Sequence, residues 1–474
     1  MKVRTRFAPS PTGFMHIGNL RSALYSYLIA KHFDGEFILR IEDTDQNRKV
    51  DGAIDFIYET CNLCGINFDE GPNNPGKYGP YIQSQRKEIY LKYAKELIDK
   101  GKAYYCFCDE KRLNFLRQKA EKRKQAFMYD GHCKNLSKEE IEKNLKENVP
   151  YVIRFSMPKE GVSSFEDVVF GKIEVDNSVL EDIVLIKSDG YPTYNFANVV
   201  DDHLMNITHV SRGNEYLMST PKYNHIYDAF GWEKPTYIHM PTVNGSDNKK
   251  LSKRNGDASF MDLYNEGYLP EAVINYLALL GWSSENNKEI FTKEELIKEF
   301  DMSRIGSSPS IYDVKKLNWF NSHYIKELSL EKLKNLTLPF LKEAYNLKDK
   351  SEEWINELIL LHQNYIDFGK EIVDATKMFF EENIELEKEA KEFMESDEKI
   401  NNTIKEFTKH IESIDWTIEN IKEAIDKTKE TSGNKGKLLF MPIRIKTTGI
   451  MHGPDLASTL HLLGKEKVLQ RLKG

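Results

Sequence analysis

The chain has 474 residues, of which 40% are hydrophobic, and its formal net charge is -7. At about 100–200 residues per domain, this length predicts three to five domains. No apolar stretch of about 18 residues occurs, so no membrane span is expected. The N-terminus lacks the apolar run of a secretory signal, which makes the cytoplasm the expected compartment. Five cysteines, an odd count, argue against a disulfide framework, and the acidic balance leaves a nucleic-acid partner dependent on a local basic patch.

The first 45 residues follow the order strand, loop, helix, strand. Residues 3–7 and 37–41 are predicted strands, and apolar residues recur at helical spacing over 20–33. This half-unit is typical of a doubly wound, Rossmann-like parallel sheet, which binds ligands at the carboxyl ends of its strands. A second α/β stretch has predicted strands at 182–186 and 207–210 and predicted helices at 194–205 and 220–230.

Two other regions have a different character. Residues 104–181 contain clustered cysteines, a Lys/Arg-rich helix at 111–124 and a strand-rich piece, so we interpret them as an α+β insertion that splits the core. From residue 340 to 441 there is no proline, and apolar residues recur at three- and four-residue steps, which predicts all-α domains. The predicted parts are 1–103 (first half of the core), 104–181 (insertion), 182–240 (second half), 241–330 (a domain with a lysine-rich loop) and 331–474 (helical region).

A first motif opens the predicted helix after residue 13. The common G-x-x-x-x-G-K-[ST] and G-x-G-x-x-G fingerprints are absent. Instead, His16 and Asn19 place an imidazole and an amide at a helix N-terminus, where free N–H groups and the helix dipole favour a phosphate. Gly18 lets a flat ring approach the backbone. The plainer interpretation is a turn followed by a helix that Asn19 caps.

A second motif is a basic loop about 230 residues later along the chain. Lys249, Lys250, Lys253 and Arg254 fall within six positions, close to Gly256. Such a loop can clamp a triphosphate and neutralise a leaving pyrophosphate. The alternative is a solvated basic surface.

Together the two motifs resemble the signature pair of class I aminoacyl-tRNA synthetases: His-Ile-Gly-Asn at 16–19 and Lys-Leu-Ser-Lys-Arg at 250–254. The runs at 6–13, 40–45, 69–72, 187–194 and 197–203 resemble the glutamyl and glutaminyl branch of that family. The glutaminyl branch usually has a second histidine where this chain has Asn19, and it carries β-barrels where this tail is helical. The layout is therefore more similar to the bacterial glutamyl enzymes.

The resemblance implies a reaction in two steps. Glutamate and ATP form a glutamyl-adenylate with release of pyrophosphate, and glutamate then passes to tRNA-Glu with release of AMP. The alternative is a non-discriminating form that also charges tRNA-Gln. ATP with Mg²⁺, the tRNA and a monomeric state are implied, with 104–181 at the acceptor end, 241–330 at the stem and 331–474 at the anticodon.

The resemblance also implies a set of site residues. The catalytic ones are His16, Asn19 and Lys253. The ATP-binding ones are Gly18, Glu215, Lys250, Ser252 and Lys253. The glutamate-binding ones are Arg6, Ser10, Glu42, Tyr194 and Arg212. Glu42 suits the ammonium group, and Arg6 and Arg212 suit carboxylates because guanidinium binds them bidentately; we assign the side-chain carboxylate to Arg212. The alternative for Arg212 is an ordinary surface ion pair.

Three cysteines, Cys106, Cys108 and Cys133, have the spacing of soft ligands in a structural zinc site. The resemblance places a fourth ligand two residues after the last cysteine, where this chain has Asn135, a poor ligand for zinc. Tyr129 or His132 can substitute, with Tyr129 our assignment. The alternative is a group of reduced, partly buried thiols.

Two further patterns have two interpretations each. Cys61 and Cys64 form a C-x-x-C, but with Ala53 and Ile57 they share one helical stripe, which favours buried packing over redox chemistry. Seven basic residues of the insertion suit either phosphate contacts or a solvated helix; they are Lys111, Arg112, Arg117, Lys119, Lys122, Arg123 and Lys124.

Three rival functions have specific counter-arguments. A paralogue that glutamylates a modified anticodon base looks truncated after the lysine-loop domain, whereas this chain has about 140 further residues, counted from the sequence. Other nucleotidyltransferases with a similar first motif lack the insertion and the tail. A catalytically dead RNA-binding module is disfavoured because Arg6, His16, Glu42 and Lys253 are all present.

Overall fold

The computed structural model describes residues 2–13, 15–45, 50–245, 251 and 259–474. The chain forms two compact units. The first comprises Met1–Asp262 and Ile274–Asp313, and the second comprises Leu263–Val273 and Val314–Gly474. Among the helices of the described ranges, none is long and apolar enough to cross a membrane. The predicted five-part division stays a prediction.

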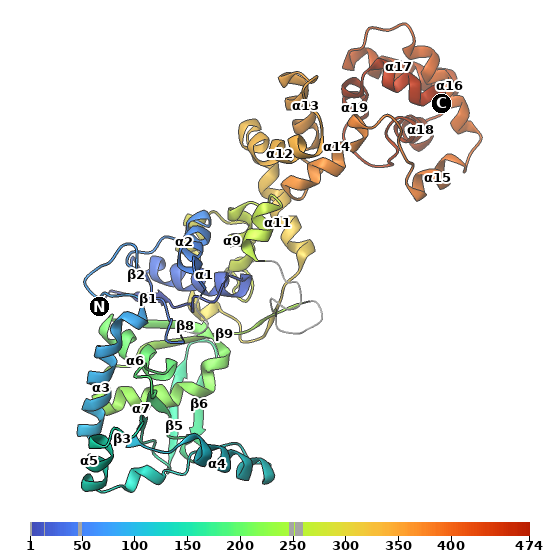
Figure 1. Cartoon of the computed structure of the whole chain (residues 1–474). Coiled ribbons are helices and arrows are strands. Elements are labelled where there is room, and N and C mark those ends of the chain that lie inside the picture. The colour runs from blue at the N-terminus through green and yellow to red at the C-terminus, as the bar shows by residue number, and fades with distance from the viewer. Residues whose placement is uncertain (1, 14, 46–49, 246–250, 252–258) are drawn as a thin grey trace. The chain divides into compact units, whose positions relative to one another are not determined.

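The core of the first unit is a parallel sheet assembled from both halves of the predicted fold (Figure 1). Strands β1 (Arg4–Phe7) and β2 (Glu36–Leu39) pair in parallel, as do β8 (His209–Gly213) and β9 (Thr236–Met240). The N–H of Thr208 donates to the carbonyl of Arg4 at 2.9 Å, which joins β1 to β8. The predicted Rossmann-like core is therefore confirmed.

Helices cover this sheet close to where they are predicted. Helix α1 (Ile17–His32) connects β1 to β2, and its buried residues run from Ile17 to Ala30. Helix α7 (Thr220–Phe230) has the predicted bounds, with proline in its first turn and Gly231 after its end. The other helices of this part are α2 (Ala53–Leu63), α3 (Lys87–Asp99) and α6 (Tyr194–Leu204).

The middle segment forms two sheets rather than one insertion sheet. Strands β3 (Ala103–Cys106), β4 (Val152–Phe155) and β7 (Val184–Ile186) make an antiparallel sheet, accompanied by α4 (Glu110–Lys122) and α5 (Lys138–Lys146). Strands β5 (Val162–Asp167) and β6 (Gly171–Asp176) instead extend the core sheet, because Asp167 pairs with Tyr237 of β9. The placement of 182–186 among the parallel core strands was therefore wrong, since an apolar run does not specify its partner strand.

The first unit is completed by short elements after β9. They are β10 (Val243–Asn244), β11 (Ser310–Ile311), α10 (Lys293–Glu299) and most of α9 (Pro270–Ala278). Helix α8 (Phe260–Asn265) runs from the first unit into the second. The 3-10 helices of the chain include η2 (Gln83–Arg86), η3 (His132–Asn135), η4 (Asn177–Val179), η5 (Asn214–Ser219), η7 (Met302–Arg304) and η8 (Gly369–Glu371).

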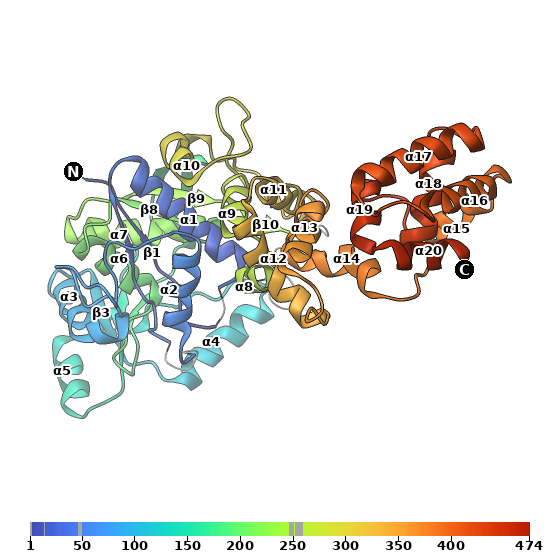
Figure 2. The ribbon, with the colours of Figure 1, turned by 90° about the horizontal axis from the view of Figure 1, so that it is seen from above.

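The regular structure of the second unit consists of helices, with no strand among its described residues, as predicted. Its helices are α11 (Val314–Lys326), α12 (Leu330–Ala344), α13 (Glu352–His362), α14 (Ile372–Phe380), α15 (Lys388–Met394), α16 (Lys399–Ile411), α17 (Ile418–Ser432), α18 (Lys437–Thr448), α19 (Leu456–Leu463) and α20 (Lys465–Lys473). Helices α16–α20 gather into one bundle (Figure 2). Leu358 on α13 packs into its core, with Trp354 beside it, so the helical spacing seen in the sequence corresponds to a buried face.

Candidate active site

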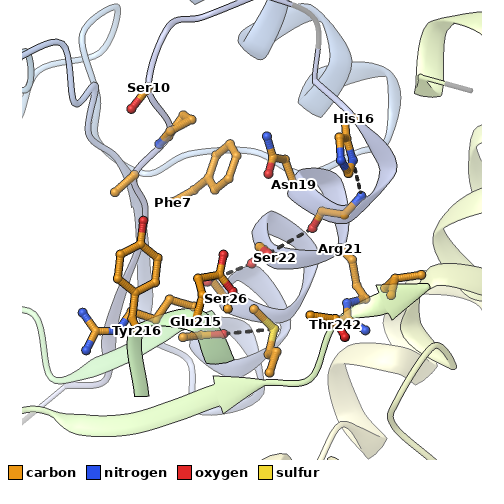
Figure 3. Close-up of a pocket in the computed structure, with 18 of the residues that line it drawn as sticks. Phe7, Ser10, His16, Asn19, Arg21, Ser22, Ser26, Glu215, Tyr216 and Thr242 are labelled. Carbon is orange, nitrogen blue, oxygen red and sulfur yellow. Dashed lines mark hydrogen bonds between the residues drawn. The ribbon is translucent and has the colours of Figure 1, made fainter. Parts of the chain in front are cut away.

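A cavity of about 450 Å³ opens where β1 and β8 end (Figure 3). Its walls come from the loop after β1, the start of α1, the segment after β2, the start of α6 and the end of β8. This is the carboxyl edge of the parallel sheet, where α/β folds bind ligands. Nine of the predicted site residues line it: Arg6, Ser10, His16, Gly18, Asn19, Glu42, Tyr194, Arg212 and Glu215. The other three, Lys250, Ser252 and Lys253, lie outside the described residues.

The start of α1 is capped by His16, not by Asn19. The N–H of Gly18 donates to His16 Nδ1 at 2.9 Å, whereas Asn19 lies within the first turn. A Cβ at Gly18 would lie 3.0 Å from His16 Cε1, so glycine is needed for the imidazole to approach the backbone. The interpretation of Asn19 as the cap was therefore wrong, because the imidazole reaches back to a helical N–H as short polar side chains usually do.

Two described residues, Leu251 within the lysine-rich loop and Ser259 after it, lie close to the cavity. Ser259 forms an antiparallel bridge with His16. The N–H of Leu251 donates to the carbonyl of Val243 at 3.0 Å, and Leu251 lines the cavity. Leu251 and Ser259 thus each lie beside a residue that lines the cavity, Val243 and His16 respectively.

Arg212 is buried in the cavity wall and is held by neutral groups. Its Nε donates to His239 Nε2 at 3.0 Å, and its Nη2 donates to Thr220 Oγ1 at 2.8 Å. The guanidinium also lies over the ring of Tyr223, 4.8 Å from the centroid. Within the described ranges, no carboxylate forms an ion pair with it. The alternative of a surface ion pair was wrong, since the side chain is only 7% exposed.

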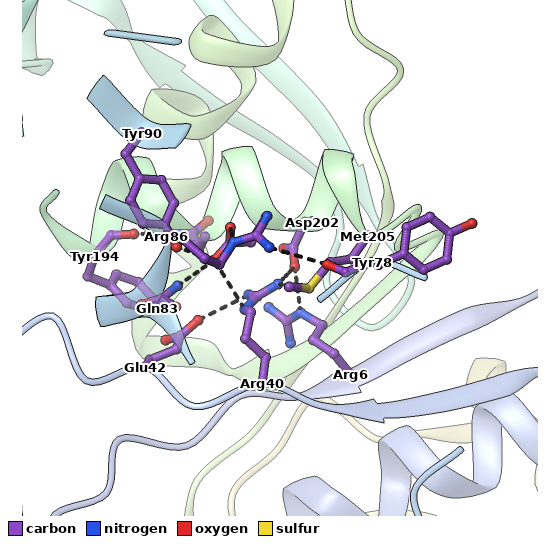
Figure 4. Close-up of polar contacts among 12 residues, drawn as sticks. Arg6, Arg40, Glu42, Tyr78, Gln83, Arg86, Tyr90, Tyr194, Asp202 and Met205 are labelled. Carbon is purple, nitrogen blue, oxygen red and sulfur yellow. Dashed lines mark hydrogen bonds and ion pairs between the residues drawn. The ribbon is translucent and has the colours of Figure 1, made fainter. Parts of the chain in front are cut away.

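Arg6 and Glu42, which also line the cavity, belong to a buried network of charges (Figure 4). Asp202 Oδ1 accepts from Arg6 Nε at 3.1 Å and from Arg40 Nη1 at 2.6 Å, and Arg40 Nη2 donates to Glu42 Oε1 at 3.0 Å. Burial raises the pKa of the Glu42 carboxyl, against the opposing effect of Arg40 and Arg6. A ligand ammonium group beside Glu42 would favour the charged form of its carboxylate, which suits the predicted role.

Several residues around the cavity were not assigned a role from the sequence. Arg40 and Asp202 stand in the quoted runs 40–45 and 197–203 but carried no assignment. Arg21 is buried in the wall and donates to the carbonyls of Leu280, at 2.7 Å, and Pro241. The single charge in the otherwise uncharged run 20–28 was the available signal, because a charged residue on a helix face that packs in the core is rarely buried without a partner.

The three cysteines of the insertion form a compact cluster. The sulfurs of Cys106, Cys108 and Cys133 all lie within 4.8 Å of one another. The hydroxyl of Tyr129 is 3.3 Å from the sulfurs of both Cys106 and Cys108, and it accepts the N–H of Cys133 at 3.1 Å. His132 is exposed and is not part of the cluster. Three thiols and a phenol at these distances are a donor set that a zinc ion can use.

The other two cysteines are buried apart from this cluster. Cys61 lies on α2 with Ala53 and Ile57, all of them buried, and Cys64 follows the helix end. Burial raises the pKa of the Cys61 thiol to about 12, so the reactive thiolate is disfavoured. The expected buried packing is confirmed.

Comparisons with known proteins agree with this geometry. Residues 2–319 match the family of tRNA synthetases class I (E and Q), catalytic domain, and residues 332–474 match an anticodon binding domain. A glutamate–tRNA ligase of Clostridium botulinum (strain Eklund 17B / Type B) is 51% identical over 480 residues, which cover 100% of this chain and 98% of that protein. One of Clostridium novyi (strain NT) is 61% identical over 360 residues, 74% of this chain and 73% of that protein.

A solved structure extends the similarity to three dimensions. The crystal structure of a glutamate tRNA ligase from Elizabethkingia meningosepticum CCUG26117, in complex with its amino acid, matches with a TM-score of 0.90 at 37% identity. The match covers 100% of this chain and 99% of that chain. The parallel core and its cavity thus define a synthetase of the class I fold. The chain belongs to the family of class I tRNA synthetases for glutamate and glutamine.

Proposed function

We propose that the chain is a glutamate–tRNA ligase, which activates L-glutamate with ATP and transfers it to tRNA-Glu. The observation that carries this is the cavity itself: a buried arginine held by neutral groups and a buried glutamate line it together with the start of α1. The names of the full-length relatives support glutamate as the amino acid. They give no support to the alternative in which tRNA-Gln is charged as well.

The predicted pocket matches the charges of glutamate, which has one ammonium group and two carboxylates. Glu42 takes the ammonium group, and Arg212 takes the side-chain carboxylate. Arg6 binds the α-carboxylate. Its Nε–H donates to Asp202 and one N–H of Nη1 donates to the carbonyl of Ser211, so the remaining N–H groups bind the ligand. Ser10 and Tyr194 complete the wall.

ATP occupies the part of the cavity beside the start of α1. His16 and Asn19 face the phosphates, Gly18 leaves room for the nucleotide, and Glu215 lies on the opposite wall. Lys250, Ser252 and Lys253, which lie outside the described residues, act on the triphosphate. Mg²⁺ accompanies the triphosphate.

The chemistry leaves little covalent work for side chains. An oxygen of the α-carboxylate attacks the α-phosphorus of ATP, and the bond to pyrophosphate breaks. A ribose hydroxyl of the terminal tRNA adenosine then attacks the carbonyl carbon of the mixed anhydride, loses its proton, and AMP leaves with the bonding electrons. Orientation and neutralisation of charge therefore supply most of the rate.

The tRNA contacts follow from the basic and helical parts. Helix α4 has no buried residue along its 13 positions, so its lysines can contact phosphates of the acceptor end, whereas Arg112 already pairs with Asp130. The match of residues 332–474 to an anticodon binding domain supports anticodon contacts for the second unit. We propose a monomeric state, as the family resemblance implies.

Zinc would be held by Cys106, Cys108, Cys133 and Tyr129, where it would fix the end of β3 to the turn at 131–135 as a structural ion. Arg154, whose guanidinium lies 4.1 Å from the centroid of the Tyr129 ring, would offset the excess negative charge of three thiolates. Metal analysis of the purified chain should find about one zinc per molecule, and Tyr129→Phe should lower zinc affinity about tenfold or more. Metal-free protein with unchanged stability after chelation would contradict this assignment.

The deciding experiment is ATP–pyrophosphate exchange, with and without tRNA, over a panel of amino acids. We expect exchange with glutamate and not with glutamine or aspartate, followed by charging of tRNA-Glu in an aminoacylation assay with both purified tRNAs. Exchange with a different amino acid, or none under any condition, would refute the proposed function.

A further inference from the structure

A line of three buried residues runs from the middle segment of the chain to the cavity. Asp167 ends β5, His239 lies on β9 and Arg212 lies on β8. Asp167 Oδ2 is 2.6 Å from His239 Nδ1, and His239 Nε2 is 3.0 Å from Arg212 Nε. All three are buried, with His239 0% exposed.

The hydrogen-bond pattern determines which nitrogen of the imidazole carries the proton. Asp167 Oδ2 also accepts the backbone N–H of His239 at 3.1 Å, and its Oδ1 accepts the N–H groups of Val169 and Phe170 at 3.0 Å. A carboxylate so held only accepts, so His239 Nδ1 must donate to it. Arg212 only donates, so His239 Nε2 must accept from it. Both ends of the line therefore require the same neutral tautomer.

This arrangement holds Arg212 by hydrogen bonds to neutral groups, without a direct ion pair to a carboxylate. Arg6 and Arg40 donate to Asp202, and Arg86 donates to Asp201. Arg212 instead donates to a neutral imidazole and a neutral hydroxyl, and that hydroxyl, of Thr220, donates onward to the carbonyl of Tyr216 at 3.0 Å. The carboxylate of Asp167 acts on Arg212 only through the ring of His239.

We infer that Asp167 and His239 are positioning residues, which hold Arg212 in place while leaving its positive charge for an anionic ligand group. A carboxylate paired directly with Arg212 would offset part of its positive charge and would so reduce its preference for an anionic ligand group over a neutral amide. The line from Asp167 to Arg212 thus makes the cavity prefer glutamate over glutamine. This inference rests on the proposed function, in which Arg212 binds the side-chain carboxylate.

Two substitutions at His239 separate the positioning role from simple packing. In His239→Gln, the amide oxygen can occupy the place of Nε2 and accept from Arg212. In His239→Asn, the shorter amide reaches Asp167 but not Arg212. In Asp167→Asn, the amide N–H donates to His239 Nδ1, so the ring proton moves to Nε2. The Nε2–H then faces the Nε–H of Arg212, and the hydrogen bond between them is lost.

The readout is the KM for glutamate and for ATP in pyrophosphate exchange with tRNA present, together with the ratio of kcat/KM for glutamate over glutamine. Asp167→Asn and His239→Asn should raise the KM for glutamate by about tenfold to a hundredfold and reduce the glutamate preference, with the KM for ATP unchanged. His239→Gln should stay close to wild type. If Asp167→Asn does not fold, the pair at His239 supplies the same comparison.

Two outcomes would overturn the inference. One is an unchanged KM for glutamate in folded Asp167→Asn and His239→Asn. The other is an equal rise in the KM values for glutamate and ATP, which would indicate a structural role only. Wild-type protein that does not activate glutamate at all would refute the proposed function instead, so the two failures are distinguishable.

Discussion

The buried arginines near the cavity differ in what holds them, and this predicts different results when each is removed. Arg40 is fully buried and pairs with Asp202 and Glu42, so Arg40→Ala leaves Glu42 without its ion pair and Asp202 with Arg6 alone, and should cost about 3–5 kcal/mol of stability. Arg212→Ala removes bonds to neutral groups only, so its fold should persist. Its kcat/KM for glutamate should fall on the order of 10²–10³-fold, as expected for loss of a buried charge-assisted contact.

Thermal unfolding and glutamate-dependent pyrophosphate exchange, measured on both variants, check this contrast. Wild-type exchange in Arg212→Ala would show that Arg212 does not bind substrate.

Glu42 predicts a pH dependence of glutamate binding. Burial raises the pKa of its carboxyl, so in the free protein the charge is lost at a higher pH than the usual value of about 4.3 for glutamate side chains. Because the ammonium group needs the carboxylate, the KM for glutamate should rise as the pH falls through this raised pKa, while the KM for ATP should change less. By linkage, protonation of Glu42 stabilises the free protein, so this contribution to stability is present at low pH and is lost as the pH rises through the raised pKa.

The control is Glu42→Gln, which should bind glutamate weakly and without this pH dependence. Parallel pH profiles in the two proteins would contradict the assignment of Glu42 to the ammonium group.

At the scale of elements, the start of α1 combines a structural and a proposed catalytic role in His16. His16→Ala removes the cap to the N–H of Gly18 and should cost about 0.5–2 kcal/mol of stability, as well as activity. His16→Asn keeps a good capping side chain, so its stability should approach that of wild type while the rate of pyrophosphate exchange falls on the order of 10²–10³-fold.

Unfolding temperature and exchange rate, measured for both variants, separate the two roles. A fully active His16→Asn would remove His16 from the catalytic set.

Elements were predictable from the sequence where their ends carry local signals. Helix α7 has the predicted bounds because proline in its first turn and Gly231 after its end mark both limits. Helix α1 begins at Ile17, within the motif 16–19 that was predicted to open it, whereas the apolar spacing alone marks it only from Leu20. The sheet that contains 184–186 and the bond from Asp167 to His239 depend on strand pairing between distant segments, which no local pattern encodes.

The residues that line the candidate site could be predicted from the sequence, whereas the residues that hold them in place could not. The glutamate pocket came from the resemblance, and its five residues line one cavity. The sequence analysis missed the groups that hold those residues. Asp202 accepts a hydrogen bond from Arg6 and His239 accepts one from Arg212, and these contacts exist only in the folded chain.

At the scale of the whole molecule, the chain enters its second unit before it finishes the first. Residues 263–273 belong to the second unit, although Ile274–Asp313 return to the first. Within the second unit, the ring of Tyr268 stacks on Phe368 with centroids 4.9 Å apart, and the N–H of Leu269 donates to Asn321 Oδ1 at 2.8 Å. Asn321 is 0% exposed, and its Nδ2 donates to the carbonyl of Asp367 at 2.6 Å. Asn321 therefore joins segments that are far apart in the sequence.

A chain cut at residue 313 should therefore be less stable than one cut at 330, which keeps Asn321 on α11, and both should be less stable than the full chain. In the full chain, Asn321→Ala leaves the N–H of Leu269 and the carbonyl of Asp367 without this partner, at a cost of about 1–3 kcal/mol for each buried group left unsatisfied. Denaturant unfolding of the two truncations and of Asn321→Ala measures these differences, with the exposed Asn402→Ala as the matched control. Equal stability of the chains ending at 313 and 330 would show that residues 263–273 do not depend on α11, and the division of the chain into two interleaved units would then have no energetic meaning.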